Sequence, residues 1–162
     1  MKKILYVITA ALCLVACENN TPEGGSTYVD LGLSSGTKWK TANEQKPQDQ
    51  ENGFYTYDEA VDSFGINLPT KEQWEELVNE CTWTWTGMGY KVIGSNGNSI
   101  TLPAAGSRDC SGSVGFVGRG GFYWSSTPDG SECAWSLHFY SDEVGTYLNY
   151  YRCGGLSVRL VR

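Results

Sequence analysis

The chain has 162 residues, and its 12 lysines and arginines against 18 aspartates and glutamates give a formal charge of −6. The basic residues are scattered, whereas a nucleic-acid interface needs a basic stripe that neutralises phosphates. Composition therefore argues against nucleic acid as a partner.

Residues 1–16 have the pattern of an export signal. Lys2 and Lys3 precede an apolar run that is too short to span a bilayer. The run ends in "LVAC", which resembles the lipobox of bacterial lipoproteins, where cleavage leaves the cysteine as a lipidated N-terminus. We therefore expect a lipoprotein signal peptide over residues 1–16 and lipidation of Cys17. A soluble secreted protein with a chance cysteine at this place is the alternative.

The segment after Cys17 is polar and contains glycines, so residues 17–27 are expected to form a flexible tether. Residues 28–162 then suit a single domain with its own core. Loss of Lys2 and Lys3 with the signal peptide takes the formal charge to −8.

Two capping boxes predict two helices. In "TYDEAVDSF" Thr56 is followed three residues later by Glu59, and in "LPTKEQWEELVNEC" Thr70 is followed by Gln73. The second segment also has the spacing of a helix with one buried face. Its apolar positions are Trp74, Leu77, Val78 and Cys81.

Strands are expected beyond residue 81. "YKVIGSNGNSITLPAAG" predicts a hairpin with a turn at Asn96 and Gly97. The Gly-rich stretch over residues 108–121 is expected to be a surface loop without regular elements. Four short strands follow, "FYWSST", "WSLHFYS", "TYLNYYR" and "LSVRLVR". Helices early and antiparallel strands late predict an α+β fold.

Alternation along a strand assigns side chains near the C-terminus to two faces. Leu137, Phe139 and, by the same parity, Trp135 are expected in the core, with Ser136, His138 and Tyr140 presented on the other face. In the next strand Leu148 is expected in the core. Tyr147, Asn149 and Tyr151 then point towards solvent or ligand, whereas Tyr150 shares the parity of Leu148. The alternative is that all these rings stabilise the sheet by packing.

Four cysteines remain if Cys13 leaves with the signal peptide and Cys17 is lipidated, and export permits disulfides between them. A turn centred on residue 143 places Cys133 opposite Cys153, which leaves a disulfide between these two open. Cys81 is expected to act as a small buried hydrophobe.

Several motifs carry a family resemblance: "YVDLGLSSGTKW", "LPTKEQWEELVNECTWTWT", "SNGNSITLPAAGSRD", "YWSSTP" and "SVRLVR". In this order they resemble the Fibrobacter succinogenes major paralogous domain, common in lipoproteins of Bacteroidetes. The resemblance covers residues 28–162. It implies a C-type lectin-like fold with two helices, small antiparallel sheets and long Gly-rich loops that carry binding.

The C-terminal pattern also resembles the variable proteins of diversity-generating retroelements, in which mutated adenines diversify chosen codons. Codons derived from AAC or AAT encode Tyr, Asn, Asp, His, Ser, Gly and Cys, but never Trp or Glu. This resemblance implies that Trp135 and Glu132 lie outside the diversified class. It implies ligand binding by His138, Tyr140, Asp142, Tyr147, Asn149, Tyr150 and Tyr151, with Cys153 in the same codon class and Cys133 as an optional further member.

Motifs for chemistry are missing from the sequence. It has none of the calcium-binding motifs of sugar-binding C-type lectins, a single histidine and no Cys-x-x-Cys pair, so no metal or cofactor is expected. One enzyme alternative is a formylglycine-generating oxidase, in which Cys133 and Cys153 would supply the cysteine pair. The chain lacks the catalytic motif of those enzymes, so we expect no enzyme activity.

These observations favour an outer-membrane lipoprotein of the cell envelope, exposed at the surface, that binds a protein or glycan on another surface. Its membrane contact would be the lipid anchor alone. The alternative is a fimbria-like structural subunit that pairs through an exposed strand edge.

Overall fold

The computed structural model describes residues 27–46 and 53–162, and this part of the chain is mainly β-structure. Strands account for 43% of it and helices for 16%. The expected α+β class is therefore wrong, because the two α-helices have only 8 and 10 residues while the three longest strands have 8 or 9. The lectin-like fold expected from the family resemblance is likewise not supported.

The described residues form helices and strands in the following order along the chain. They are β1 (Tyr28–Asp30), β2 (Lys38–Lys40), α1 (Tyr57–Phe64), the 3-10 turn η1 (Gly65–Asn67), α2 (Lys71–Glu80), β3 (Thr82–Trp85), β4 (Gly89–Ile93), β5 (Ser99–Pro103), β6 (Ser107–Arg108), β7 (Val114–Gly115), β8 (Gly121–Asp129), β9 (Cys133–Tyr140) and β10 (Glu143–Tyr151).

Both helices begin as the capping boxes predict. The hydroxyl of Thr56 accepts a hydrogen bond from the Glu59 amide, and the Glu59 carboxylate accepts one from the Thr56 amide. Thr70 and Gln73 make the same reciprocal pair at the start of α2. Each box satisfies two amides that the first helical turn leaves without partners.

Within the described part of the chain the strands form four antiparallel sheets, with the orders β1-β2, β3-β4-β5, β6-β7 and β10-β9-β8. The predicted hairpin is confirmed, with β4 paired to β5 across the turn at Gly97.

Two other expectations are wrong. The stretch 108–121 is not a plain loop, because Val114–Gly115 pairs with Ser107–Arg108. "LSVRLVR" forms isolated bridges instead of a strand, because its backbone bonds pass to several different partners.

The β8–β10 sheet has core side chains on both faces, as alternate residues of its strands belong to different clusters. Tyr123, Leu137 and Phe139 pack with α2 and with the β3–β5 sheet. Phe122, Trp124 and Ala134 pack with α1 and with the chain between residues 156 and 160. The sheet is therefore the central layer, and its orientation determines which side chains reach the surface.

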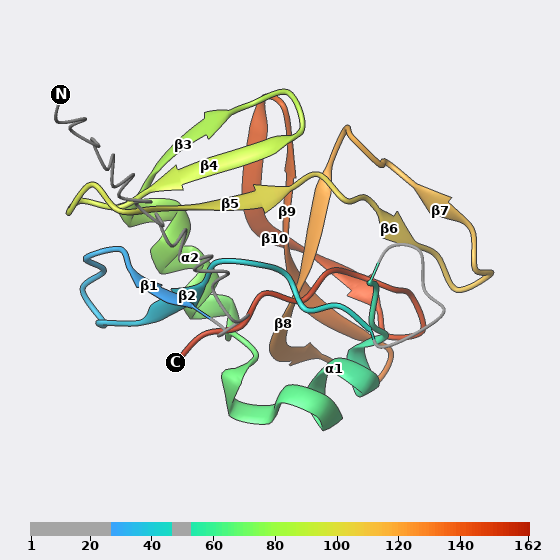
Figure 1. Cartoon of the computed structure of the whole chain (residues 1–162). Coiled ribbons are helices and arrows are strands. Elements are labelled where there is room, and N and C mark those ends of the chain that lie inside the picture. The colour runs from blue at the N-terminus through green and yellow to red at the C-terminus, as the bar shows by residue number, and fades with distance from the viewer. Residues whose placement is uncertain (1–26, 47–52) are drawn as a thin grey trace, which may run out of the picture.

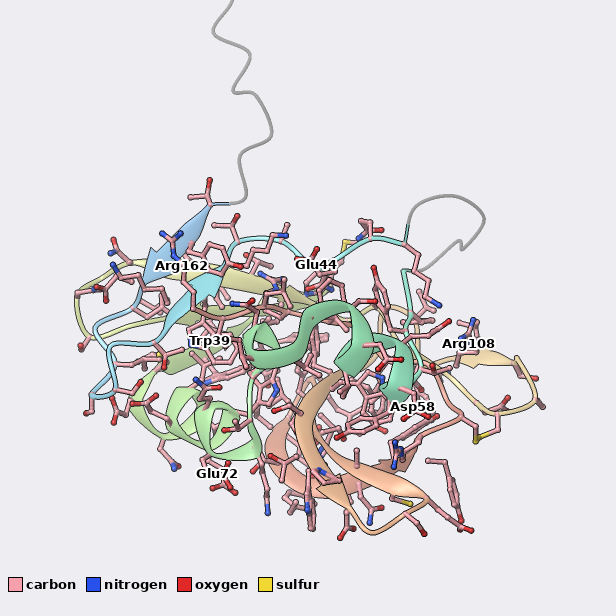
Figure 2. All side chains as sticks on the ribbon, turned by 90° about the horizontal axis from the view of Figure 1, so that it is seen from below. Trp39, Glu44, Asp58, Glu72, Arg108 and Arg162 are labelled. Atoms are coloured by element: carbon pink, nitrogen blue, oxygen red, sulfur yellow. A yellow bond between two sulfur atoms is a disulfide. The ribbon has the colours of Figure 1, made fainter. Side chains whose placement is uncertain are left out.

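The two ends of the domain lie together. Lys38 of β2 exchanges two backbone hydrogen bonds with Arg162, beside a bridge between Trp39 and Val161. The β1–β2 pair stands on one side of the molecule and the β6–β7 hairpin on the opposite side (Figure 1). Figure 2 shows the same separation, with Arg162 beside β1 and Arg108 on the hairpin.

The expected signal peptide (1–16), the lipidation site Cys17 and most of the tether (17–27) lie outside the described residues. Within residues 27–46 and 53–162, no helix has the length and apolarity to cross a membrane.

Candidate binding face

The β9–β10 hairpin has a tighter turn than expected. Glu143 pairs with Tyr140, so the turn consists of Ser141 and Asp142. A bulge between Gly145 and Leu148 then shifts the register of the two strands. A bulge places two residues of one strand opposite one residue of its partner and re-aims the side chains there.

This register excludes the Cys133–Cys153 disulfide that the sequence left open. Cys133 lies opposite Tyr151, and the chain turns away before Cys153, which forms a disulfide with Cys110 instead. Cys133 and Cys81 are free thiols, each partly buried. Cys81 packs at the edge of the core, and burial raises the pKa of its thiol to about 11.

His138 is buried, with only 1% of its surface exposed, so its expected presentation to solvent is wrong. Its neighbours across the sheet are Phe122 on β8 and Gly145 on β10. The ring of Tyr147 covers it edge to face, with 4.6 Å between ring centroids. The bulge brings Tyr147 back over Gly145, where even a Cβ atom would collide with the tyrosine ring. Ser136, also expected on the presented face, is buried as well.

The His138 imidazole is surrounded by few polar groups. Neither ring nitrogen has a hydrogen-bond partner among the described residues, and Nε2 lies 3.7 Å from Oε1 of Glu143. Burial lowers the pKa of His138, and the Glu143 carboxylate opposes this shift. The side chain is therefore neutral near pH 7.

A group of rings continues from His138 along the same face of the sheet. Phe116, which follows β7, packs against Phe122 and Tyr140 with ring centroids 5.6 and 6.0 Å away. Tyr150 lies 6.4 Å from Phe122. We name this group the aromatic face, and it consists of Phe116, Phe122, His138, Tyr140, Tyr147 and Tyr150.

Exposure within the aromatic face is uneven. Tyr147 is 58% exposed and Phe116 43%, whereas Tyr140 and Tyr150 are half-buried. Leu148 shares the parity of Tyr150 and is 44% exposed, so its expected place in the core is wrong. Leu148 belongs to neither of the two core clusters. The exposed members give the sheet an apolar surface with tyrosine hydroxyls.

Two of the seven predicted site residues lie on the opposite face. Asn149 pairs across the sheet with Trp135 and donates a hydrogen bond to Asp129, and Tyr151 pairs with Cys133 and is 61% exposed. Trp135 is half-buried rather than core, and the Lys71 ammonium lies 3.9 Å from its ring centre. Asp142 is exposed in the turn. The structure therefore groups His138, Tyr140, Tyr147 and Tyr150 and separates them from Asn149 and Tyr151.

A pocket of about 150 Å³ opens beside the aromatic face, between the β6–β7 hairpin and β10. Its lining includes the polar side chains of Ser107, Asp109 and Ser113 and the aromatic rings of Phe116 and Tyr150. The Tyr150 hydroxyl lies 3.3 Å from the Ser107 hydroxyl. The Cys110–Cys153 disulfide joins the hairpin to the chain just after β10, so it links the two sides of this pocket.

Sequence reasoning missed Phe116 and the hairpin residues of the pocket. Phe116 stands in a Gly-rich stretch with no periodic pattern, so only its aromatic type in an otherwise small-residue segment could have drawn attention to it. Its contacts with Tyr140 and Phe122 depend on pairing between strands far apart in the chain.

Residues 27–46 and 53–162 contain no group of three or more His, Cys, Asp or Glu side chains placed to hold a metal ion. Cys133 and Cys153 do not form a pair, because Cys153 is bonded to Cys110. The oxidase alternative therefore loses the cysteine pair on which it depended.

Residues 85–161 match the family model of a domain of unknown function, DUF8237. The match begins at the end of β3 and includes the aromatic face and the pocket. No curated protein and no solved structure matches the chain.

Proposed function

We propose that this protein binds a ligand through the aromatic face, displayed from the cell envelope on a lipid anchor. The observation that carries the proposal is the exposure of Tyr147, Phe116 and Leu148 on one face of a sheet that is otherwise packed on both sides. Tyrosine and phenylalanine give large contact areas with few rotatable bonds, and the tyrosine hydroxyl adds a hydrogen bond. The sheet beneath them supplies rigidity.

The ligand in this proposal is a protein or glycan of another surface. The lipobox-like "LVAC" supports the anchor at Cys17 in the outer membrane, and the short polar segment after it supports display away from the membrane. The codon class of Tyr140, Tyr147 and Tyr150 supports a diversified face. Recognition requires no turnover, so the proposed role is binding without catalysis.

Tyr147 and Tyr151 supply a matched test of this proposal. They are residues of the same type on the same strand, 58% and 61% exposed, and their rings lie on opposite faces. The full chain, anchored in phospholipid vesicles, is applied to a printed glycan array and to intact bacterial cells. We expect Tyr147→Ser to lower retention at least tenfold, because central aromatic side chains dominate interface energies. We expect Tyr151→Ser to leave it within twofold.

Three results would count against the proposal. They are equal retention of the two variants, no retention of any cell or glycan by the wild-type chain, and a Cys17→Ser variant that stays on the vesicles. Polymers formed by the purified chain alone would instead favour a structural subunit. Among the described residues no strand pairs with the outer edge of β10, and that edge would supply the contact.

A further inference from the structure

Phe116 lines the pocket between the β6–β7 hairpin and β10, and its backbone has an unfavourable conformation. Phe116 has a φ of 62° and is the only non-glycine residue among those described with a positive φ. Large side chains rarely adopt this conformation, and such outliers gather at binding sites where the surroundings enforce them. Here the surroundings include Gly106, since a Cβ atom at this glycine would lie 2.1 Å from the Gly115 carbonyl oxygen.

The lining of the pocket also includes polar side chains, one of which is a carboxylate. Oδ1 of Asp109 accepts hydrogen bonds from the Ser111 amide, the Ser111 hydroxyl and the Ser113 amide. These bonds, the Ser111 hydroxyl foremost, lower the pKa of Asp109, so it is ionised near pH 7. The hydroxyls of Ser107, Ser113 and Tyr150 add groups to the lining that can both donate and accept hydrogen bonds.

Charges around the pocket are of both signs. The Arg119 guanidinium lies 5.7 Å from the centre of the Phe116 ring and already occupies a cation position there. Asp109 is the charged side chain among the lining residues, whereas Arg119 lies beside the Phe116 ring without lining the pocket. The Asp109 carboxylate in the lining disfavours an anionic ligand, and the Arg119 guanidinium already beside the Phe116 ring disfavours a cation stacked there, so the two together favour a neutral ligand.

We propose that this pocket binds one ring of a neutral hexose, as a terminal or side residue of a surface glycan. This inference rests on the proposed function, which it deepens by naming the ligand class. The C–H face of the sugar would pack on Phe116 and Tyr150, because C–H groups are attracted to the negative face of an aromatic ring. The sugar hydroxyls would donate to Asp109 and exchange hydrogen bonds with Ser107 and Ser113.

The size of the pocket limits the ligand to a single ring. Its volume of about 150 Å³ is well below that of clefts for drug-sized molecules, which begin at roughly 300 Å³. One hexose with few contacts is expected to bind with a dissociation constant of about 1 mM. Display of many copies on one membrane would raise the overall avidity for a repeating glycan.

The test uses the full chain and three probes, the methyl glycosides of glucose, galactose and mannose. Binding is measured by saturation-transfer NMR. The variant Phe116→Asn removes the ring but keeps a residue type that tolerates positive φ. Its control is Val117→Asn, because Val117 is exposed on the same loop and does not line the pocket. We expect at least one hexoside to bind and its affinity to fall at least fivefold in Phe116→Asn. Val117→Asn should remain within twofold of wild type.

Absence of saturation for all three glycosides overturns the inference, and so does equal loss of affinity in the Phe116 and Val117 variants. Stronger binding of glucuronate or of lysine methyl ester in a Phe116-dependent manner also overturns it, because the pocket would then select a charge. If no hexoside binds but retention on cells or glycans still depends on Tyr147, this inference fails while the proposed function stands. If a hexoside binds through Phe116 but retention does not depend on Tyr147, the proposed function fails at the aromatic face.

Discussion

The His138 imidazole is held neutral by its position beneath Tyr147. It is buried, its ring nitrogens have no hydrogen-bond partner among the described residues, and the only carboxylate shown near it is that of Glu143. A buried group that must ionise costs free energy unless a partner compensates. Glu143 compensates only in part, since it is itself exposed and 3.7 Å away.

Stability is therefore expected to depend on pH through His138. Its pKa is lowered in the folded state, so the unfolded chain takes up the proton first as the pH falls. Above a pH of about 6.5 the imidazole is neutral in both states and has no effect. Below that pH the free energy of unfolding decreases, until the lower folded-state pKa is reached. Urea unfolding at pH 7.5, 6 and 5 should show a larger loss for wild type than for His138→Phe.

Glu143→Gln supplies the control for this prediction. The variant removes the carboxylate that favours the protonated imidazole, so it should lower the pKa of His138 further and extend the loss of stability to lower pH. If wild type and His138→Phe lose the same free energy between pH 7.5 and 5, the imidazole does not contribute.

At the scale of elements, the start of α2 attaches the helix to the central sheet. The Lys71 amide donates to the Thr127 hydroxyl, and the indole of Trp74 donates to the Trp124 carbonyl oxygen. Both partners belong to β8, which contributes Phe122 to the aromatic face. The capping box at Thr70 lies at this junction.

Thr70→Ala is expected to lower the free energy of unfolding by about 1 kcal/mol, because it removes one acceptor for the first-turn amides. Asp62→Ala is the control, since Asp62 is an exposed residue inside α1 and should change stability by less than about 0.5 kcal/mol. Urea unfolding followed by tryptophan fluorescence measures both. Equal effects of the two substitutions would show that the cap is not a stabilising contact.

At the scale of the whole molecule, the Cys110–Cys153 disulfide joins segments 43 residues apart. It links the β6–β7 hairpin covalently to the chain just after β10. Arg108 of the hairpin and Gly155 also exchange two backbone hydrogen bonds near this link. A cross-link of this length restricts the unfolded chain and so stabilises the folded state.

Loss of this disulfide is expected to lower the free energy of unfolding by roughly 2–4 kcal/mol. The double variant Cys110→Ser/Cys153→Ser should show this loss, whereas Cys133→Ser should remain close to wild type. Mass spectrometry of unreduced peptides should recover a 110–153 link, with Cys81 and Cys133 open to alkylation after unfolding. A 133–153 link in the native protein would contradict the structure.

The sequence alone predicts the features that depend on residues close together in the chain. A capping box joins residues three apart, and the apolar spacing of α2 describes one face of a single helix. The hairpin with its turn at Asn96 and Gly97 is equally local. All three predictions are confirmed. The strands β8, β9 and β10 were also expected at nearly their observed positions. The same reading indicated Leu137 and Phe139 as core, and both are buried.

Only the tertiary structure decided which rings share a face and which cysteines are joined. A bulge at Gly145 to Leu148 changes parity along β10, so Tyr147 covers His138 while Tyr151 points to the other side. Parity from sequence cannot anticipate a bulge, because one inserted residue reverses every assignment beyond it. Cys153 pairs with Cys110, and Phe116 meets Tyr140, because the β6–β7 hairpin packs next to a sheet whose strands follow it in the chain. Such contacts depend on the packing of distant segments, which local sequence patterns do not encode.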